Sequence, residues 1–104
     1  MITTIVHFSL PKENADKLLA KWREIEAVMI KQPGVIDGVF HRCIDDDSPF
    51  QFVNVAHWES PEALANALQA SAQEQQKRGV DIIAFMNGLG VKISQNNYVE
   101  EMRY

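Results

Sequence analysis

Apolar and polar residues alternate between positions 52 and 58 in the way typical of a β-strand. Successive strand side chains point to opposite faces, and one face then carries four of them: Phe52, Asn54, Ala56 and Trp58. Two valines, Val53 and Val55, point the other way. Asparagine is disfavoured inside strands, and a polar side chain in such a setting needs a hydrogen-bond partner. That partner could be a ligand.

The first half of the chain predicts two more strands around a helix. Residues 2–8 are rich in β-branched and aromatic side chains and predict a strand. Pro11 suits the first turn of a helix, whose apolar residues recur at helical spacing: Leu18, Leu19, Trp22, Ile25 and Met29. Pro33 and Gly34 end this helix. Residues 35–44 then predict a second strand, and a polar turn leads into the third strand over residues 50–59.

The second half predicts a helix and a final strand. Ser60 is a good N-cap, Pro61 suits the first helical position, and Gly79 supplies a stop. The apolar residues 80–86 predict either a short helical turn or a lid over a cavity. A last strand is expected within residues 91–104, although polar residues 95–97 weaken its centre.

This order, βαββαβ, predicts an α+β, ferredoxin-like domain that spans residues 1–104. Its antiparallel sheet should carry both helices on one face, because crossover connections are right-handed. The third strand is apolar on both faces, so the uncovered face needs a second partner. A two-fold homodimer that joins the open sheet faces is the simplest solution.

Composition and charge narrow the classes of partner. The chain has 104 residues, a net charge of −4 and a pI near 5.2, so we expect neither nucleic-acid nor anionic-membrane binding. Cys43 is the single cysteine, which excludes an internal disulfide. We see no signal-peptide pattern and no apolar run near the roughly 20 residues of a membrane helix. A cytoplasmic protein is expected.

The segment from Phe52 to Trp58, followed by Ser60 and a helix that begins Glu62-Ala63-Leu64, resembles the antibiotic biosynthesis monooxygenase family. The resemblance extends over essentially the whole chain in length and element order. It implies the dimeric α+β barrel fold, with sheets packed back to back and one cavity per subunit between sheet and helices. Well-understood members of this family oxidise polycyclic phenols to quinones with O₂, without metal or flavin.

The resemblance also implies site residues. A strand asparagine, a tryptophan four residues later and an arginine twenty beyond it are used in the family, which corresponds to Asn54, Trp58 and Arg78. A tyrosine six residues after the tryptophan is replaced here by Leu64, which puts the same polyphenol substrate in doubt. Haem-degrading relatives use an Asn, a Trp and a His where this chain has three other residues, so haem degradation is not expected: His7, Ala67 and Lys77.

The three matching residues suit oxygen chemistry, because a phenolate can pass one electron to O₂ when fixed donors stabilise the oxyanion and water is excluded. Asn54, Trp58 and Arg78 all carry N–H donors. Each also has a structural reading: Trp58 as core, Asn54 as a tie to a neighbouring loop, and Arg78 as a solvated cation at a helix end.

Other residues complete the expected site. His7 is either a general base or a hydrogen-bonded structural histidine. Apolar walls are expected from the second helix and the short segment after it: Leu64, Leu68, Ile82, Phe85 and Met86. The three histidines lack metal-ligand spacing, and no nucleotide motif is present, so we expect no metal and no cofactor.

The leading hypothesis is a cofactor-independent monooxygenase that acts on a small phenolic or quinol-type aromatic substrate with O₂. Its main alternative is a non-catalytic binding or stress-response dimer with the same pocket, which the leucine at position 64 favours. A third possibility is an isomerase or decyclase that turns over without O₂.

Overall fold

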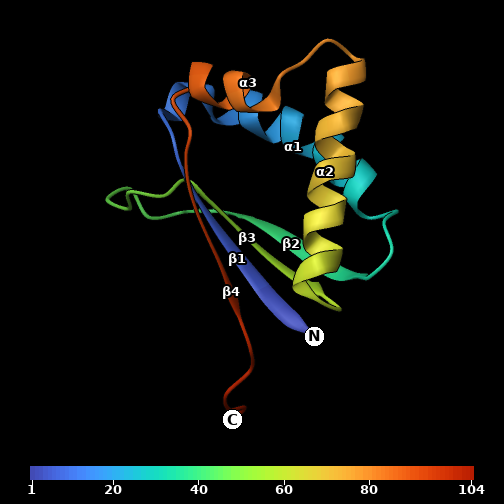
Figure 1. Cartoon of the computed structure of the whole chain (residues 1–104). Coiled ribbons are helices and arrows are strands. Elements are labelled where there is room, and N and C mark those ends of the chain that lie inside the picture. The colour runs from blue at the N-terminus through green and yellow to red at the C-terminus, as the bar shows by residue number, and fades with distance from the viewer.

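The computed structural model describes residues 1–104 and shows a four-stranded antiparallel sheet with its helices on one face (Figure 1). In chain order the elements are β1 (Ile2–Ser9), η1 (Lys12–Asn14, a 3₁₀ turn), α1 (Ala15–Met29), β2 (Val35–Arg42), β3 (Phe52–Trp58), α2 (Pro61–Lys77), α3 (Ile82–Gly88) and β4 (Lys92–Tyr98). The strands lie in the order β2-β3-β1-β4. The predicted ferredoxin-like fold is confirmed.

Local signals account for the helix starts. The Ser60 hydroxyl accepts a hydrogen bond from the Ala63 backbone N–H at 3.1 Å, and Pro61 opens α2. The Asp81 carboxylate accepts from the N–H groups of Ile83 and Ala84 and caps α3. Residues 80–86, which the sequence left open between a helical turn and a lid, therefore contribute to a capped helix.

Two strands, β2 and β3, are shorter than the sequence predicted, whereas β1 extends one residue further, to Ser9. β2 ends at Arg42 rather than at residue 44, and β3 runs from Phe52 to Trp58 rather than over 50–59. One reason lies in Gln51, whose side-chain oxygen accepts from the Leu10 N–H at 2.7 Å and fastens the β2–β3 loop to the end of β1. After β4, residues 99–104 extend away from the sheet (Figure 1).

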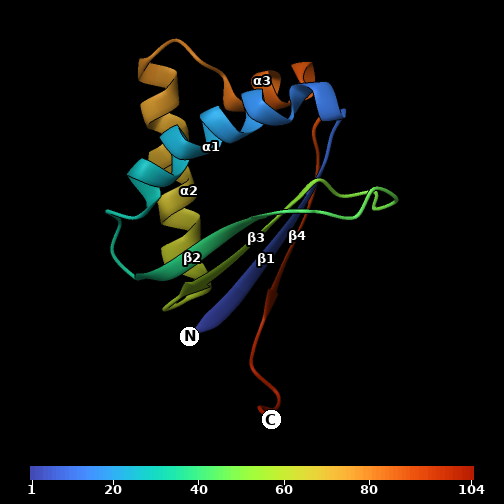
Figure 2. The ribbon, with the colours of Figure 1, turned by 180° about the vertical axis from the view of Figure 1, so that it is seen from behind.

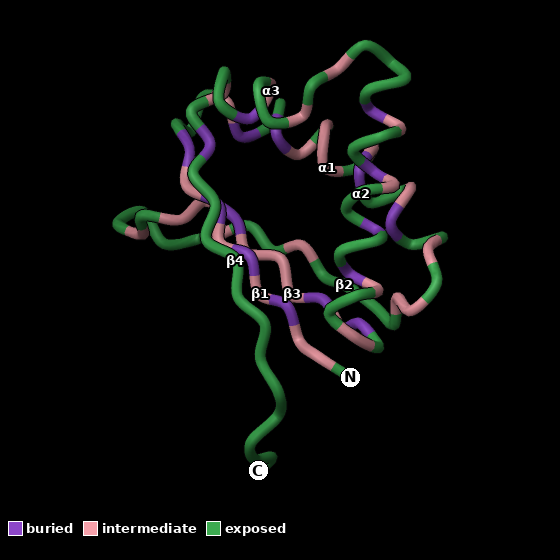
Figure 3. Tube along the Cα trace, in the orientation of Figure 1, coloured by how far each residue is buried: buried purple, intermediate pink, exposed green.

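The core lies between the helices and the sheet, where the inward residues of β1 and β3 are buried (Figure 3). Phe52 and Trp58 are 1% and 2% exposed, as the alternation along β3 requires. An aromatic cluster joins α1 to three strands, with ring centroids 5.0–5.5 Å apart: Phe8, Trp22, Phe40 and Phe52. The Trp22 indole stacks on Phe40.

The opposite face of the sheet has no helix over it, as the view from behind shows (Figure 2). Ile5, Val55 and Val39 lie in register across β1, β3 and β2 and form an apolar row on this face. Val39 is 55% exposed. None of the helices combines the length and the apolar character that crossing a lipid bilayer requires.

Candidate functional site

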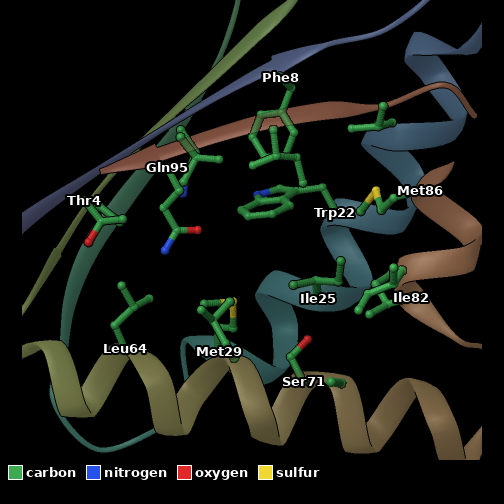
Figure 4. Close-up of a pocket in the computed structure, with 18 of the residues that line it drawn as sticks. Thr4, Phe8, Trp22, Ile25, Met29, Leu64, Ser71, Ile82, Met86 and Gln95 are labelled. Carbon is green, nitrogen blue, oxygen red and sulfur yellow. The ribbon is translucent and has the colours of Figure 1, made fainter. Parts of the chain in front are cut away.

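A cavity of about 370 Å³ lies between the sheet and the helices (Figure 4). Fifteen of its twenty lining residues are hydrophobic. β1, β3 and β4 form one wall, α2 lies opposite, and residues of α1 and α3 line further parts of the cavity. An apolar chamber with a small number of polar groups is the usual form of a small-molecule site.

The polar groups of the lining residues are neutral amides, hydroxyls and two indole N–H groups. Thr4 donates to the side-chain oxygen of Asn97 at 2.8 Å and is thereby satisfied. The side-chain hydrogen bonds within the protein involve none of the other polar lining groups, of which Gln95 is exposed to solvent: Asn54, Trp58, Ser71, Asn87 and Gln95. Polar groups inside proteins normally have partners, so this unfilled capacity is available to a ligand.

Asn54 and Trp58 lie on the inward face of β3, and the structure brings both to the cavity. Both also line a second cavity of about 400 Å³ between α1 and β2. Trp22, Met29 and Ala56 likewise border both cavities. Asn54 and Trp58 therefore stand in the wall where the two cavities adjoin.

Arg78 does not reach the cavity in this structure. Its guanidinium lies 3.5 Å from the carboxylates of both Glu24 on α1 and Glu74 on α2. Glu24 also pairs with Lys21 at 2.6 Å, and Lys21 donates to the buried Gln75 side chain at 3.0 Å. The physical reason is position: the C-cap of α2 carries Arg78 beyond the lining residues, where carboxylates of two helices surround it.

His7 lies on the open face of the sheet, opposite the cavity, because β1 turns Val6 and Phe8 inward. Its ring packs near Phe50, with centroids 4.9 Å apart. His57 points to the same open face and pairs with Asp37 of β2. No group of three histidine, cysteine, aspartate or glutamate side chains is arranged to hold a metal ion.

Four of the five apolar residues predicted as walls line the cavity: Leu64, Leu68, Ile82 and Met86. The fifth, Phe85, lies outside the lining, with the Lys21 ammonium 4.9 Å above its ring. A residue on a helix points in a direction set by the rotation of that helix, which apolar content alone does not fix. In α3 that rotation turns Phe85 toward α1.

Sequence reasoning missed four polar lining residues: Thr4, Ser71, Asn87 and Gln95. Ser71 is 4% exposed, and its hydroxyl points from α2 into the cavity (Figure 4). Gln95 sits between the inward-facing Ile93 and Asn97 of β4. The alternation of side chains along β4 could have indicated that Gln95 points inward. However, the polar residues 95–97 also resemble a break in a strand.

The pKa of Glu24 is held below its usual value, chiefly by the hydrogen bond from Lys21 and further by the positive charge of Arg78. A carboxylate whose pKa is lower in the folded state stabilises the fold above its unfolded pKa, and this contribution is lost as pH falls through the folded pKa. We expect Glu24→Gln to lower the free energy of unfolding at pH 7 by roughly 0.5 kcal/mol, a small effect because the pair is screened by solvent.

Urea unfolding at pH 7 and at about pH 3, below the ordinary pKa of glutamate, measures this effect. The difference between the two proteins should be smaller at the lower pH, where protonation of Glu24 in the unfolded and then the folded state removes the contribution of its charge. Glu26→Gln is the matched control, since Glu26 is an exposed α1 residue with no ion pair. A pH-independent difference for Glu24→Gln would show that the network does not depend on its charge.

Comparisons with known proteins identify the structures that share the fold of this chain and the family to which it belongs. No curated protein matches it significantly. Solved structures share its fold: a provisionally named monooxygenase from Shewanella loihica PV-4 has a TM-score of 0.74 and 24% identity, covering 98% of this chain and 95% of that one. A provisionally named antibiotic biosynthesis monooxygenase from Deinococcus radiodurans gives 0.75 and 18%, over 100% and 96% of the two chains.

A variant of SnoaB, a cofactor-independent oxygenase from Streptomyces nogalater, gives a TM-score of 0.72 and 16% identity over 98% of this chain and 94% of its own. At 16–24% sequence identity, these solved structures show that the fold is shared and nothing further. The sequence itself goes further, because the profile of one family, described as antibiotic biosynthesis monooxygenase, matches residues 1–78. The chain belongs to the antibiotic biosynthesis monooxygenase family.

Proposed function

We propose that this protein is a monooxygenase that uses O₂, with no cofactor, to oxidise a small electron-rich phenol held in the cavity between sheet and helices. One observation carries the proposal: Asn54 and Trp58, whose side chains carry N–H donors, line a chamber in which fifteen of twenty lining residues are hydrophobic. Donors fixed in a low-dielectric site stabilise a developing oxyanion far better than water does. Family membership and the SnoaB fold point to the same chemistry.

The reaction balances without a further reductant. The phenolate gives one electron to O₂, and the phenoxyl radical and superoxide combine to form a C–O bond at a ring carbon. Loss of the proton from that carbon, with cleavage of the O–O bond, releases water and leaves a quinone. One oxygen atom enters the product and the other leaves as water.

The chain's own residues bind, orient and shield the substrate. The Asn54 amide and the Trp58 indole donate to the phenolate oxygen, and leucines of α2 with Ile82 and Met86 of α3 exclude water from the ring. His7 receives no proton in this scheme, since its ring is on the other face of the sheet, so the phenol ionises to solvent before entry. Arg78 contributes by holding α2 against α1.

Asn54→Ala should lower kcat for oxygen consumption about 100-fold, the usual loss when one oxyanion donor is removed. The measurement is oxygen uptake with a panel of hydroxylated naphthalenes, after removal of metal and flavin. Labelled O₂ should place one heavy atom in the quinone. Asn66→Ala, an exposed asparagine of α2, is the matched control and should behave like the unaltered protein.

Undiminished uptake by Asn54→Ala contradicts the site. Tight binding of a naphthol without any oxygen uptake favours instead a non-catalytic binding protein, the function that Leu64 in the cavity wall supports. Turnover without O₂ points to an isomerase or decyclase.

The working form in this proposal is a homodimer that joins the open sheet faces. The apolar row formed by the half-buried Ile5 and Val55 and the exposed Val39 supports it, because a row of β-branched side chains on an uncovered sheet face favours burial against a second sheet. Two copies of one face are self-complementary in a two-fold dimer.

Val55→Arg should convert the dimer to a monomer, because it places a charge in the middle of that row, where the partner would desolvate it. Sedimentation velocity measures the change in mass. Ile44→Arg is the control: Ile44 is 92% exposed in the β2–β3 loop, away from the sheet face. A monomer before substitution, or a dimer that survives Val55→Arg, excludes this interface.

A further inference from the structure

The inward face of the sheet carries two amides in one row. Val6 of β1 pairs in register with Asn54 of β3 on one side and with Gln95 of β4 on the other. Neighbouring strands lie about 4.8 Å apart, so the two amide-bearing residues are separated by about 10 Å across Val6. The row is therefore polar at both ends and apolar in the middle.

Both amides are free to bind a ligand. Gln95, an exposed residue of β4, extends into the cavity toward α2 (Figure 4), and Asn54 lines the same cavity from β3 with no hydrogen bond to its side chain within the protein. β4 is an edge strand, which leaves Gln95 at the open side of the chamber. The row thus runs from the wall between the two cavities to the open side.

The rest of the chamber suits a flat apolar body between these ends. Leu64 of α2 points toward the sheet, and Met29 of α1 lies below Gln95 (Figure 4). Leu68 of α2 also lines the cavity. Val6 offers only a hydrocarbon surface between the amides. A planar ring that lies along the row would contact apolar groups on its faces and amides at two opposite edges.

We infer that Gln95 is a specificity-determining residue that binds a second oxygen of the ligand, on the ring edge opposite the oxygen that Asn54 binds. The ligand class is a fused aromatic with oxygens at opposed positions, a 1,4-diol or the corresponding quinone. This inference rests on the proposed function and deepens it: oxidation of a phenol at the carbon opposite its hydroxyl would place the new oxygen next to Gln95. The Gln95 amide can donate to that oxygen whether it is hydroxyl or carbonyl.

Binding without reaction tests the inference directly. The probes are 1,4-dihydroxynaphthalene and 1-naphthol, titrated calorimetrically in the absence of oxygen. The unaltered protein should bind the diol about fivefold more tightly than the naphthol, the ratio expected for one additional hydrogen bond. In Gln95→Leu, which removes the polar groups and leaves a slightly shorter apolar side chain, that ratio should fall to about one.

Gln69→Leu makes the same change on the exposed side of α2 and should keep the fivefold ratio. Circular dichroism checks that both variants are folded. A ratio that stays at five in Gln95→Leu, equal affinities in the unaltered protein, or failure of both probes to bind would each overturn the inference.

The two experiments distinguish a failure of the role proposed for Gln95 from a failure of the proposed function. If the ratio falls in Gln95→Leu but 1-naphthol, which keeps a C–H opposite its hydroxyl, consumes no oxygen, the two-ended recognition holds and the oxygenase proposal fails. If oxygen is consumed and the ratio does not change, the oxygenase proposal holds and the role of Gln95 fails.

Discussion

The alternation of side chains along β3 is the constraint on which the rest of the structure depends. Phe52 and Trp58 must be buried, and the helices cover them. The same alternation turns Val53 and Val55 to the face that no helix covers, and it forces Asn54 inward between apolar neighbours. One strand therefore determines the core, the open face and the polar wall of the cavity.

The cavity exists because the helices cover the sheet without filling the space above it. α1 packs on the sheet through an aromatic cluster around Trp22, while α2 faces the sheet across the chamber. A polar network that includes Arg78 and Glu24 fastens the two helices together outside the chamber. The interior is left with neutral donors, which suits binding of a delocalised anion or a carbonyl more than proton transfer.

Much of the fold was accessible from sequence because its signals are local. Strand alternation, the Ser60-Pro61 cap and the Pro33-Gly34 stop each act within a few residues, and all appear where predicted. The directions in which the helix residues of the site point were harder to predict from the sequence. Arg78 matches a family spacing, yet its direction depends on carboxylates of another helix that sequence spacing does not reveal.

Gln95 shows the same limit of sequence-based prediction for a strand residue. Its significance depends on pairing with Val6, 89 residues earlier in the chain, and thereby on its alignment with Asn54. Reading β4 alone, the polar residues 95–97 only weaken a strand prediction. His7 is a related case, because whether a strand residue points to the cavity or to the open face changes with a shift of one residue.

The most direct test of the central claim, that the chamber lined by Asn54 is the substrate site, is a crystal structure of the protein soaked with 1,4-dihydroxynaphthalene without oxygen. We predict a planar ring along the Asn54–Val6–Gln95 row, with an oxygen within hydrogen-bond distance of the Asn54 amide. A chamber closed by its own side chains, or a ring bound elsewhere on the protein, would contradict the account.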